Sequence, residues 1–201
     1  MRARLFLLVV AALSAPAADA AEPIARVVER DGVAFVLRSV AAPQPLPVGA
    51  DLYLDDEVRT GADGRVVVES DAGLKLVIGA ASEVRVRRWL VEQQQSRIDI
   101  ALGMVTGILR LLGEPTDKSR SVEVQTRAAV ASVRSTEWVV DATAAGTAVF
   151  SIEGPVVVRS PSGGVTLRTG DGTDVTLTTA PTAPAHWEQP RVERTLARVP
   201  F

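Results

Sequence analysis

The sequence predicts an all-β fold, an antiparallel β-sandwich or roll, on the strength of two observations. Segments of strand length, in which apolar and polar residues alternate, recur about every 8–12 residues with glycine-containing turns between them. Helical periodicity is nearly absent until the last residues of the chain. Periodicity alone does not separate a sandwich from a β-solenoid, so both stay open at this point.

The first twenty residues are expected to be a signal peptide rather than part of the fold. Arg2 and Arg4 precede an apolar run at residues 5–13, and residues 18–20 (ADA) form a small-residue cleavage site. The run is too short to span a bilayer, and no later run reaches that length. We therefore expect a mature chain that begins at Ala21 and is periplasmic or secreted. A retained membrane anchor is the alternative.

The N-terminal half reads as strands and turns. Residues 24–36 predict a hairpin, because Asp31 and Gly32 separate two apolar segments. A proline-rich loop follows at residues 41–47. Further strands are expected at residues 74–78 and 84–91.

The middle of the chain predicts several short strands. Apolar residues share one face over residues 98–102, and residues 107–112 are expected to form a separate short apolar segment. Residues 114–120 form a charged loop with a proline. This loop leads into the stretch around which the chain is organised.

Residues 121–141 (SVEVQTRAAVASVRSTEWVVD) form that central stretch. Val122 and Val124 keep one parity, Val133 breaks it, and Trp138 restores it. A slip of one residue would turn the apolar side chains toward solvent, so we expect a bulge or a corner at residues 134–136.

After a turn at residues 142–146, strands are expected at residues 147–152, 156–158, 165–167 and 175–177. Residues 178–190 are rich in Thr, Pro and Ala. Residues 191–199 are expected to form a short helix or a packed tail.

The central stretch resembles the "T-x-x-A-x-x-x-V-R-G-T-x-F" core of the FecR domain family. The matching residues are Thr126, Ala129, Val133, Arg134, Thr136 and Trp138, and Ser135 stands where the family has glycine. An earlier segment resembles the family's opening motif, with matches at Gly49, Leu52, Asp56, Val58, Thr60 and Gly61; Asp55 replaces another family glycine. Ser82, residues 103–105 and residues 153–158 follow the family's later motifs in the same order.

The resemblance covers roughly residues 33–173 and implies a jelly-roll-like β-sandwich. On that basis the expected organisation is a signal peptide at residues 1–20, a FecR-like β domain at residues 21–178, and a Pro/Thr-rich C-terminal tail at residues 179–201.

Charge and composition restrict the function. The formal net charge is −2, which gives no general attraction for nucleic acid or anionic lipid. Cysteine is absent, so neither disulfides nor thiolate metal sites can form. The only histidine, His186, lies in the proline-rich tail and is a poor candidate for a catalytic base. We expect no enzyme activity and no cofactor.

Candidate site residues fall into three groups. Asp55, Asp56 and Glu57 belong to an acidic cluster that is a weak candidate for a metal site and is better explained as a solvated turn. Arg87 and Trp89 belong to a basic strand face, where contact with a glycan or nucleic acid competes with a simple solvated face.

Arg134 heads the third group because it interrupts an apolar pattern. A guanidinium that is partly buried needs a carboxylate partner, which Glu137, Asp141 or Glu153 could supply. We interpret Arg134 as the residue that fixes a corner of the sandwich, with ligand contact as the alternative. Thr136, Glu137 and Trp138 are candidate interaction residues beside it.

The functional hypothesis is an exported, non-enzymatic interaction or scaffold module in envelope signalling or sensing, whose partner is another envelope protein. The alternative is a module that binds carbohydrate, such as cell-wall glycan. Exposure of Trp89 or Trp138 would favour the glycan, and burial would count against it.

Overall fold

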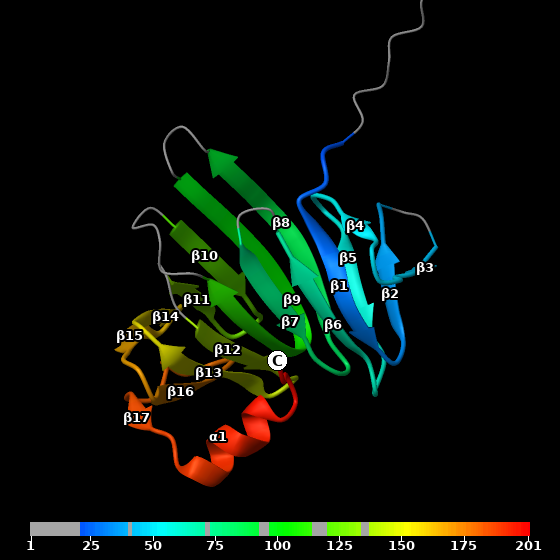
Figure 1. The fold of residues 1–201 in the computed structure, drawn as a ribbon. Coiled ribbons are helices and arrows are strands. Elements are labelled where there is room, and N and C mark those ends of the chain that lie inside the picture. Colours follow the sequence, from blue (N-terminus) through cyan, green and yellow to red (C-terminus); the bar gives the residue numbers. More distant parts are fainter. Residues whose placement is uncertain (1–20, 40–41, 71–72, 93–96, 114–119, 134–136) are drawn as a thin grey trace, which may run out of the picture.

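The computed structural model describes residues 21–39, 42–70, 73–92, 97–113, 120–133 and 137–201. Their alternating apolar residues fold into two stacked sheets, which we call sheet A and sheet B. The sheets share one long strand, β9 (Arg97–Gly113), near the middle of the molecule (Figure 1). The predicted all-β sandwich is confirmed.

Sheet A contains the second half of β9. Its strands lie in the order β4 (Asp51–Leu52), β1 (Ala25–Asp31), β6 (Arg65–Glu69), β7 (Leu74–Ile78), β9, β12 (Glu137–Ala142), β13 (Gly146–Glu153), β16 (Asp171–Thr176) and β17 (Ala185–His186).

Sheet B contains the first half of β9. Its strands lie in the order β3 (Gln44–Pro45), β2 (Ala34–Leu37), β5 (Glu57–Thr60), β8 (Glu83–Glu92), β9, β10 (Arg120–Gln125), β11 (Val130–Val133), β14 (Val156–Ser160) and β15 (Gly163–Leu167). All described pairings are antiparallel except that of β9 with β10, which is parallel.

One core lies between the two sheets. The buried side chains that point inward from sheet A include Val66, Leu76, Leu109, Leu111, Trp138 and Val140. Those from sheet B include Val58, Val84, Ile100, Leu102, Val124 and Val158. Because each strand alternates, the residues between these positions lie on the outer faces of the sandwich.

The segment expected at residues 107–112 is not a separate strand but the continuation of β9 into sheet A. The chain bends at Gly107, whose φ of 105° is in the region that favours glycine. A Cβ atom at this position would lie 2.3 Å from the Cα of Ser82. Gly107 therefore allows one strand to serve both sheets.

The predicted hairpin at Asp31 and Gly32 is wrong. The chain does turn at Gly32, which has a φ of 59°, but β1 pairs in sheet A and β2 pairs in sheet B. Both strands need an apolar face buried in the shared core, and placing them in opposite layers satisfies both. The turn is therefore a corner between sheets.

The slip of parity in the central stretch also marks a change of sheet. β11 lies in sheet B and β12 lies in sheet A, so the chain passes from one sheet to the other between them. The bulge or corner expected at residues 134–136 falls outside the described residues.

Two buried hydroxyl groups join three places where the chain passes between sheets. The Oγ1 of Thr60 donates to the carbonyl of Gly79 at 2.6 Å and accepts from the N–H of Ser82 at 2.9 Å. The Oγ of Ser82 donates to the same carbonyl at 2.8 Å and accepts from the N–H of Ile108 at 3.0 Å. These bonds satisfy backbone groups that a sheet ladder cannot reach at a corner.

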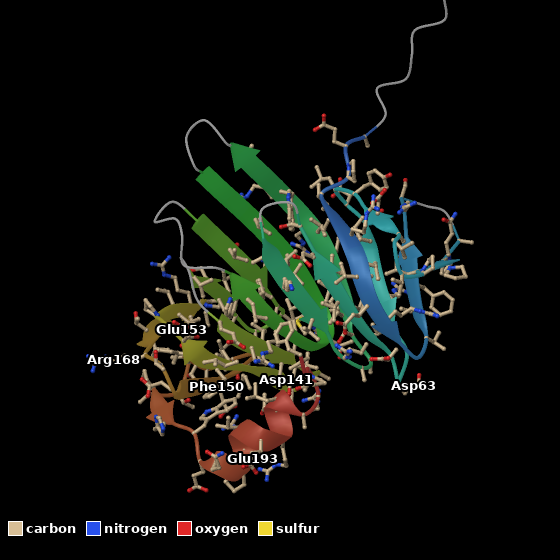
Figure 2. All side chains as sticks on the ribbon, viewed as in Figure 1. Asp63, Asp141, Phe150, Glu153, Arg168 and Glu193 are labelled. Atoms are coloured by element: carbon tan, nitrogen blue, oxygen red, sulfur yellow. The ribbon has the colours of Figure 1, made fainter. Side chains whose placement is uncertain are left out.

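The C-terminal segment covers the outer face of sheet A. As expected, it contains a short helix, α1 (Gln189–Leu196), and Figure 1 shows this helix beside β12, β13 and β16. The ring of Trp187 stacks on Phe150 with centroids 4.9 Å apart, and the guanidinium of Arg191 lies 3.6 Å from the centroid of Trp187. Figure 2 labels Phe150 and Asp141, whose carboxylate binds Arg198. The tail is therefore a packed part of the fold.

Candidate functional site

Of the candidate residues in the central stretch, the structure describes Trp138 and Glu137. Trp138 is fully buried in the shared core, with an exposed fraction of 0%, and its Nε1 has no hydrogen-bond partner within the described part of the chain. The carboxylate of Glu137 binds Arg110, whose Nε lies 2.7 Å from Oε1. Arg134 and Thr136 lie outside the described residues.

Two of the three carboxylates expected to pair with Arg134 have other arginine partners. Glu137 binds Arg110, and Asp141 binds Arg198. The third, Glu153, is exposed at the end of β13. The proposed pairing of Arg134 therefore stays a prediction.

The basic face of β8 is organised by contacts with neighbouring strands. The Nη1 of Arg87 donates to the Oε1 of Gln125 at 2.9 Å, and its side chain lies across Gly103, where a Cβ would be 2.4 Å from Nε. Arg88 forms an ion pair with Asp99 at 3.1 Å. Trp89 is half-buried and packs against the core. Because Val84 and Val86 are buried beneath them, these arginines lie on the solvated face of sheet B.

The three carboxylates of the acidic cluster diverge instead of converging. Asp56 is buried, and both of its oxygens accept from the Nε of Arg38 at 3.2 Å, while one also accepts from the N–H of Tyr53 at 3.0 Å. Glu57 points to a different set of arginines, and Asp55 is exposed. Among the described residues, no group of three or more metal-ligating side chains could hold an ion.

Asp55 also explains one of the departures from the family motif. Its φ of 68° lies in the left-handed region, where glycine is the usual residue and aspartate is one of the better-tolerated substitutes. The aspartate is therefore compatible with the left-handed backbone conformation of this turn.

Glu57 is the buried centre of an ion-pair network on sheet B. Its Oε2 accepts from Nη2 of Arg85 at 2.6 Å, and its Oε1 accepts from Nε of Arg59 at 2.7 Å. Burial raises the pKa of this carboxyl, but the hydrogen bonds and charges of Arg85 and Arg59 outweigh that effect and lower its pKa below the ordinary value of 4.5. Glu57 is therefore charged near neutral pH.

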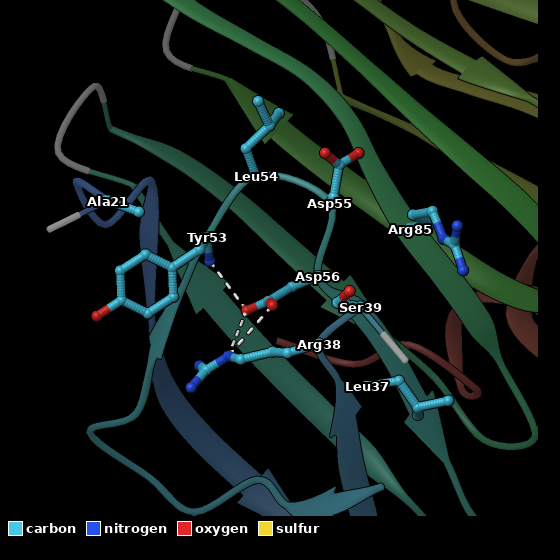
Figure 3. A pocket seen from close by; sticks show the side chains of 9 residues that line it. All are labelled: Ala21, Leu37, Arg38, Ser39, Tyr53, Leu54, Asp55, Asp56 and Arg85. Atoms are coloured by element: carbon cyan, nitrogen blue, oxygen red, sulfur yellow. Dashed lines mark hydrogen bonds and ion pairs between the residues drawn. The ribbon is translucent and has the colours of Figure 1, made fainter. Parts of the chain in front are cut away.

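Two adjoining hollows lie around this network. The larger, of about 660 Å³, is formed by the end of β2, the loop between β4 and β5, and β8 (Figure 3). The second, of about 530 Å³, continues across β5, β8 and β9 on the outer face of sheet B. They share Asp55 and Arg85. We call them together the sheet B groove.

The groove presents apolar and charged groups side by side. Leu54 is 51% exposed at one end, and Val105 is 52% exposed at the other. Between them lie the ion pairs of Asp56 and Glu57. The guanidinium of Arg38 lies 4.9 Å from the centroid of the Tyr53 ring. Such a surface suits contact with a partner of mixed polarity.

The sequence analysis identified the carboxylates of this groove but missed Arg38, Tyr53 and Leu54. Arg38 is a single cation at the end of an apolar strand, and it lies 18 residues from its partner Asp56 in the sequence. No local pattern connects the two. The contact exists only because β2 and β5 are paired.

The fold defines the class of the protein, a two-layer β-sandwich, and one of its two sheets carries an open groove. Residues 56–157, just over half of the chain, match the family model described as "FecR protein". The chain therefore belongs to the FecR family, and the resemblance seen in its motifs is confirmed.

Solved structures agree on the fold. Two crystal structures of a protein from Parabacteroides distasonis, provisionally described as an anti-sigma factor, match with a TM-score of 0.55 and 18% sequence identity. The match covers 68% of this chain and 62% of that protein, so the chain spans less than two thirds of its length. The comparison with curated proteins gives no match. Within the described residues, no helix has the length and apolar character to cross a membrane.

Proposed function

We propose that this protein is an exported, non-enzymatic interaction module of the bacterial envelope that acts in signalling or sensing by binding another protein through the sheet B groove. The observation that carries the proposal is the asymmetry of the two outer faces. The C-terminal segment covers sheet A, whereas sheet B has an open groove next to the loop between β4 and β5.

The chemistry of the groove supports binding rather than catalysis. Asp56 and Glu57 each accept hydrogen bonds from arginines, and the lowered pKa of Glu57 keeps that carboxylate charged. A general acid or base needs instead a pKa near the working pH. His186 lies on β17, in the other sheet.

The same geometry favours a protein partner over a glycan. Sugar-binding sites commonly offer an open aromatic face, but Trp138 is buried in the core and Trp89 is half-buried against it. Trp187 lies between Phe150 and Arg191. The Tyr53 ring is next to Arg38 on one side. The groove also contains Tyr53, Arg38 and Arg85, and tyrosine and arginine are enriched at protein interfaces.

The proposal includes the domain organisation. Residues 1–20 direct export and are removed, residues 21–178 form the FecR-like domain, and residues 179–201 form a tail that packs on sheet A. The Parabacteroides protein is provisionally described as an anti-sigma factor, which is consistent with a signalling role for this chain, and the FecR family membership supports that role.

A site-specific crosslinking experiment tests the function. The full chain is produced in a bacterial host with a photoreactive amino acid at Leu54 in the groove or, as a control, at Leu177, which is 46% exposed and directly follows β16 of sheet A. We expect the Leu54 position to give a discrete adduct with one envelope protein and the Leu177 position to give none.

The charge variant Leu54→Asp should remove capture of that protein, and Leu177→Asp should not. Identical adducts from both positions would contradict the groove as the binding surface. Retention of the chain by purified cell-wall glycan, sensitive to Leu54→Asp, would favour the glycan alternative. Mass spectrometry of the exported product should give Ala21 as its first residue.

A further inference from the structure

Arg87 differs from the other arginines in and beside the sheet B groove, because its charge is not matched by a carboxylate. Arg38 pairs with Asp56, Arg59 and Arg85 pair with Glu57, and Arg88 pairs with Asp99. Within the described part of the chain, Arg87 forms no ion pair, and its guanidinium bonds only to the neutral amide of Gln125. The groove therefore contains one cation that is still available to an anion.

A β-bulge places this side chain on the outer face of sheet B. The pairing of β8 with β9 slips by one residue between Val86 and Arg88, so Arg87 is an extra residue in β8. Val86 is buried, whereas Arg87 and Arg88 are both exposed. Regular alternation would turn one of two successive side chains inward, and bulges commonly redirect a side chain in this way. The bulge thus lets Arg87 line the smaller hollow while Arg88 pairs with Asp99.

The guanidinium of Arg87 is held in position by its surroundings. It lies directly over Gly103 of β9, where a Cβ atom would be 2.4 Å from Nε and 2.9 Å from Cζ. Beyond β9, its Nη1 donates to the Oε1 of Gln125 on β10 at 2.9 Å. Among the described residues, its Nε and Nη2 donate to no other group. A donor pair that is already held in place loses little conformational entropy when it binds an acceptor.

We propose that Arg87 is the anchor by which the groove binds an aspartate or glutamate side chain of its protein partner. This inference rests on the proposed function, because it requires the groove to be a protein-binding surface. A planar guanidinium binds a carboxylate through two parallel hydrogen bonds, and arginine is enriched among the residues that dominate binding energy. Val105, which is 52% exposed in the same hollow, offers an apolar contact to the segment that carries the carboxylate.

The other charges of the hollow favour a single carboxylate over a polyanion. Asp55, Glu57 and Glu83 line the hollow together with Arg87. Nucleic acids and anionic membranes gain affinity from many basic contacts, and they would meet these three acids instead. Asp55 is also without an arginine partner in the part of the chain that the structure describes. We therefore expect the partner to present a basic side chain close to its acidic one.

Three variants separate the anchor from the rest of the groove. Gly103→Ala should displace the guanidinium but keep its charge, because the three atoms nearest to the added Cβ all belong to Arg87. Gln125→Glu should bind Arg87 with a carboxylate of the chain itself. Arg88→Gln is the matched control, since it removes a neighbouring charge that is already paired with Asp99. Melting curves first establish that each variant is folded.

The purified full chain, with the photoreactive residue at Leu54, is titrated into an envelope extract. We expect Gly103→Ala and Gln125→Glu to raise the concentration needed for half-maximal adduct by roughly tenfold or more, and Arg88→Gln to change it less than about twofold. Folded variants at both positions that form the adduct as readily as the native chain would overturn the proposal. So would selective binding of the native groove to DNA or to vesicles that contain anionic lipid.

Acetate tests the anchor without the partner. It is titrated against the native chain at constant ionic strength, with chloride as the reference, and the Nε–H resonances of the arginines are followed by NMR. The Arg87 resonance should shift at least about twofold further than that of Arg159, which is exposed on β14 and forms no ion pair among the described residues. Gln125→Glu should remove the difference.

The two experiments distinguish failure of the anchor from failure of the proposed function. Equal acetate shifts at Arg87 and Arg159 would overturn the anchor, even if the Leu54 position still gives an adduct and the groove keeps its function. The absence of any Leu54 adduct would contradict the proposed function and the protein origin of the carboxylate. The acetate titration would then still decide whether Arg87 binds a carboxylate.

Discussion

Replacing Ser82 with alanine tests whether the corner hydroxyls hold the two sheets together. The Ser82 side chain is buried, and its Oγ is both donor to Gly79 and acceptor for the N–H of Ile108. Alanine has nearly the same volume, so the change creates little cavity. It removes the acceptor of a buried N–H at the bend of β9.

The expected loss of stability follows from the N–H of Ile108, which is left without an acceptor. A buried backbone donor left without an acceptor costs about 1–3 kcal/mol. The carbonyl of Gly79 still accepts a hydrogen bond from Thr60, so the loss of the Ser82 donor adds little to this cost. We therefore expect Ser82→Ala to lower the free energy of unfolding by about 2 kcal/mol, and the melting temperature by roughly 4–8 °C for a domain of this size.

Urea titration followed by tryptophan fluorescence measures this difference, with an unchanged slope showing that the unfolded state is the same. Ser162→Ala, at an exposed turn, is the matched control and should stay within about 0.5 kcal/mol of the native chain. Thr60→Val combined with Ser82→Ala should cost less than the sum of the single changes, because the two hydroxyls share partners. A Ser82→Ala protein as stable as the control would refute the reasoning.

Three further predictions concern the bend, the groove and the tail. Gly107→Ala should lower the free energy of unfolding by about 3 kcal/mol or more, because a φ of 105° is unfavourable for alanine and its Cβ would clash with the backbone of Ser82. A melting curve like that of the native chain would show that the bend in β9 does not require glycine at this position. Because the folded-state pKa of Glu57 is lowered, its ionised form stabilises the fold above about pH 4.5, and this contribution is lost as pH falls through the lowered pKa. Glu57→Gln should therefore be less stable than the native chain at pH 7, and its free energy of unfolding should fall less between pH 7 and pH 3. If the free energies of unfolding of the two proteins fell in parallel with pH, the network of Glu57 with Arg85 would be contradicted. Trp187→Ala should cost about 3–5 kcal/mol through loss of the stack on Phe150 and speed cleavage of the C-terminal segment in limited proteolysis, whereas unchanged cleavage would show that the tail is held by other contacts.

The sequence analysis succeeded where a feature depends on near neighbours. The turn between β14 and β15, the strand at residues 74–78 and the helix after Trp187 each depend on alternation, glycine positions or proline within a few residues. The family motifs were also correctly recognised, and the structure supplies the physical role of Thr60 and Ser82 within them.

It failed where two solutions share the same local pattern. Asp31 and Gly32 make a good turn in either a hairpin or a corner, and only the need to bury both apolar faces in one core decides between them. In the same way, residues 98–102 and 107–112 read as two strands in the sequence. In the structure the chain bends between them but stays one hydrogen-bonded strand, and no local sequence pattern reveals this.

By itself, the sequence determined that this chain is built of short alternating strands, that it resembles the FecR family, and where most turns fall, because the pleat repeats every two residues and turn residues act locally. The tertiary structure decided which strands pair, which carboxylate binds which arginine, and which face of the sandwich stays open. Those outcomes join residues far apart in the chain, such as Arg65 with the carbonyl of Pro200 or Glu57 with Arg85, and they follow from packing two layers around one core.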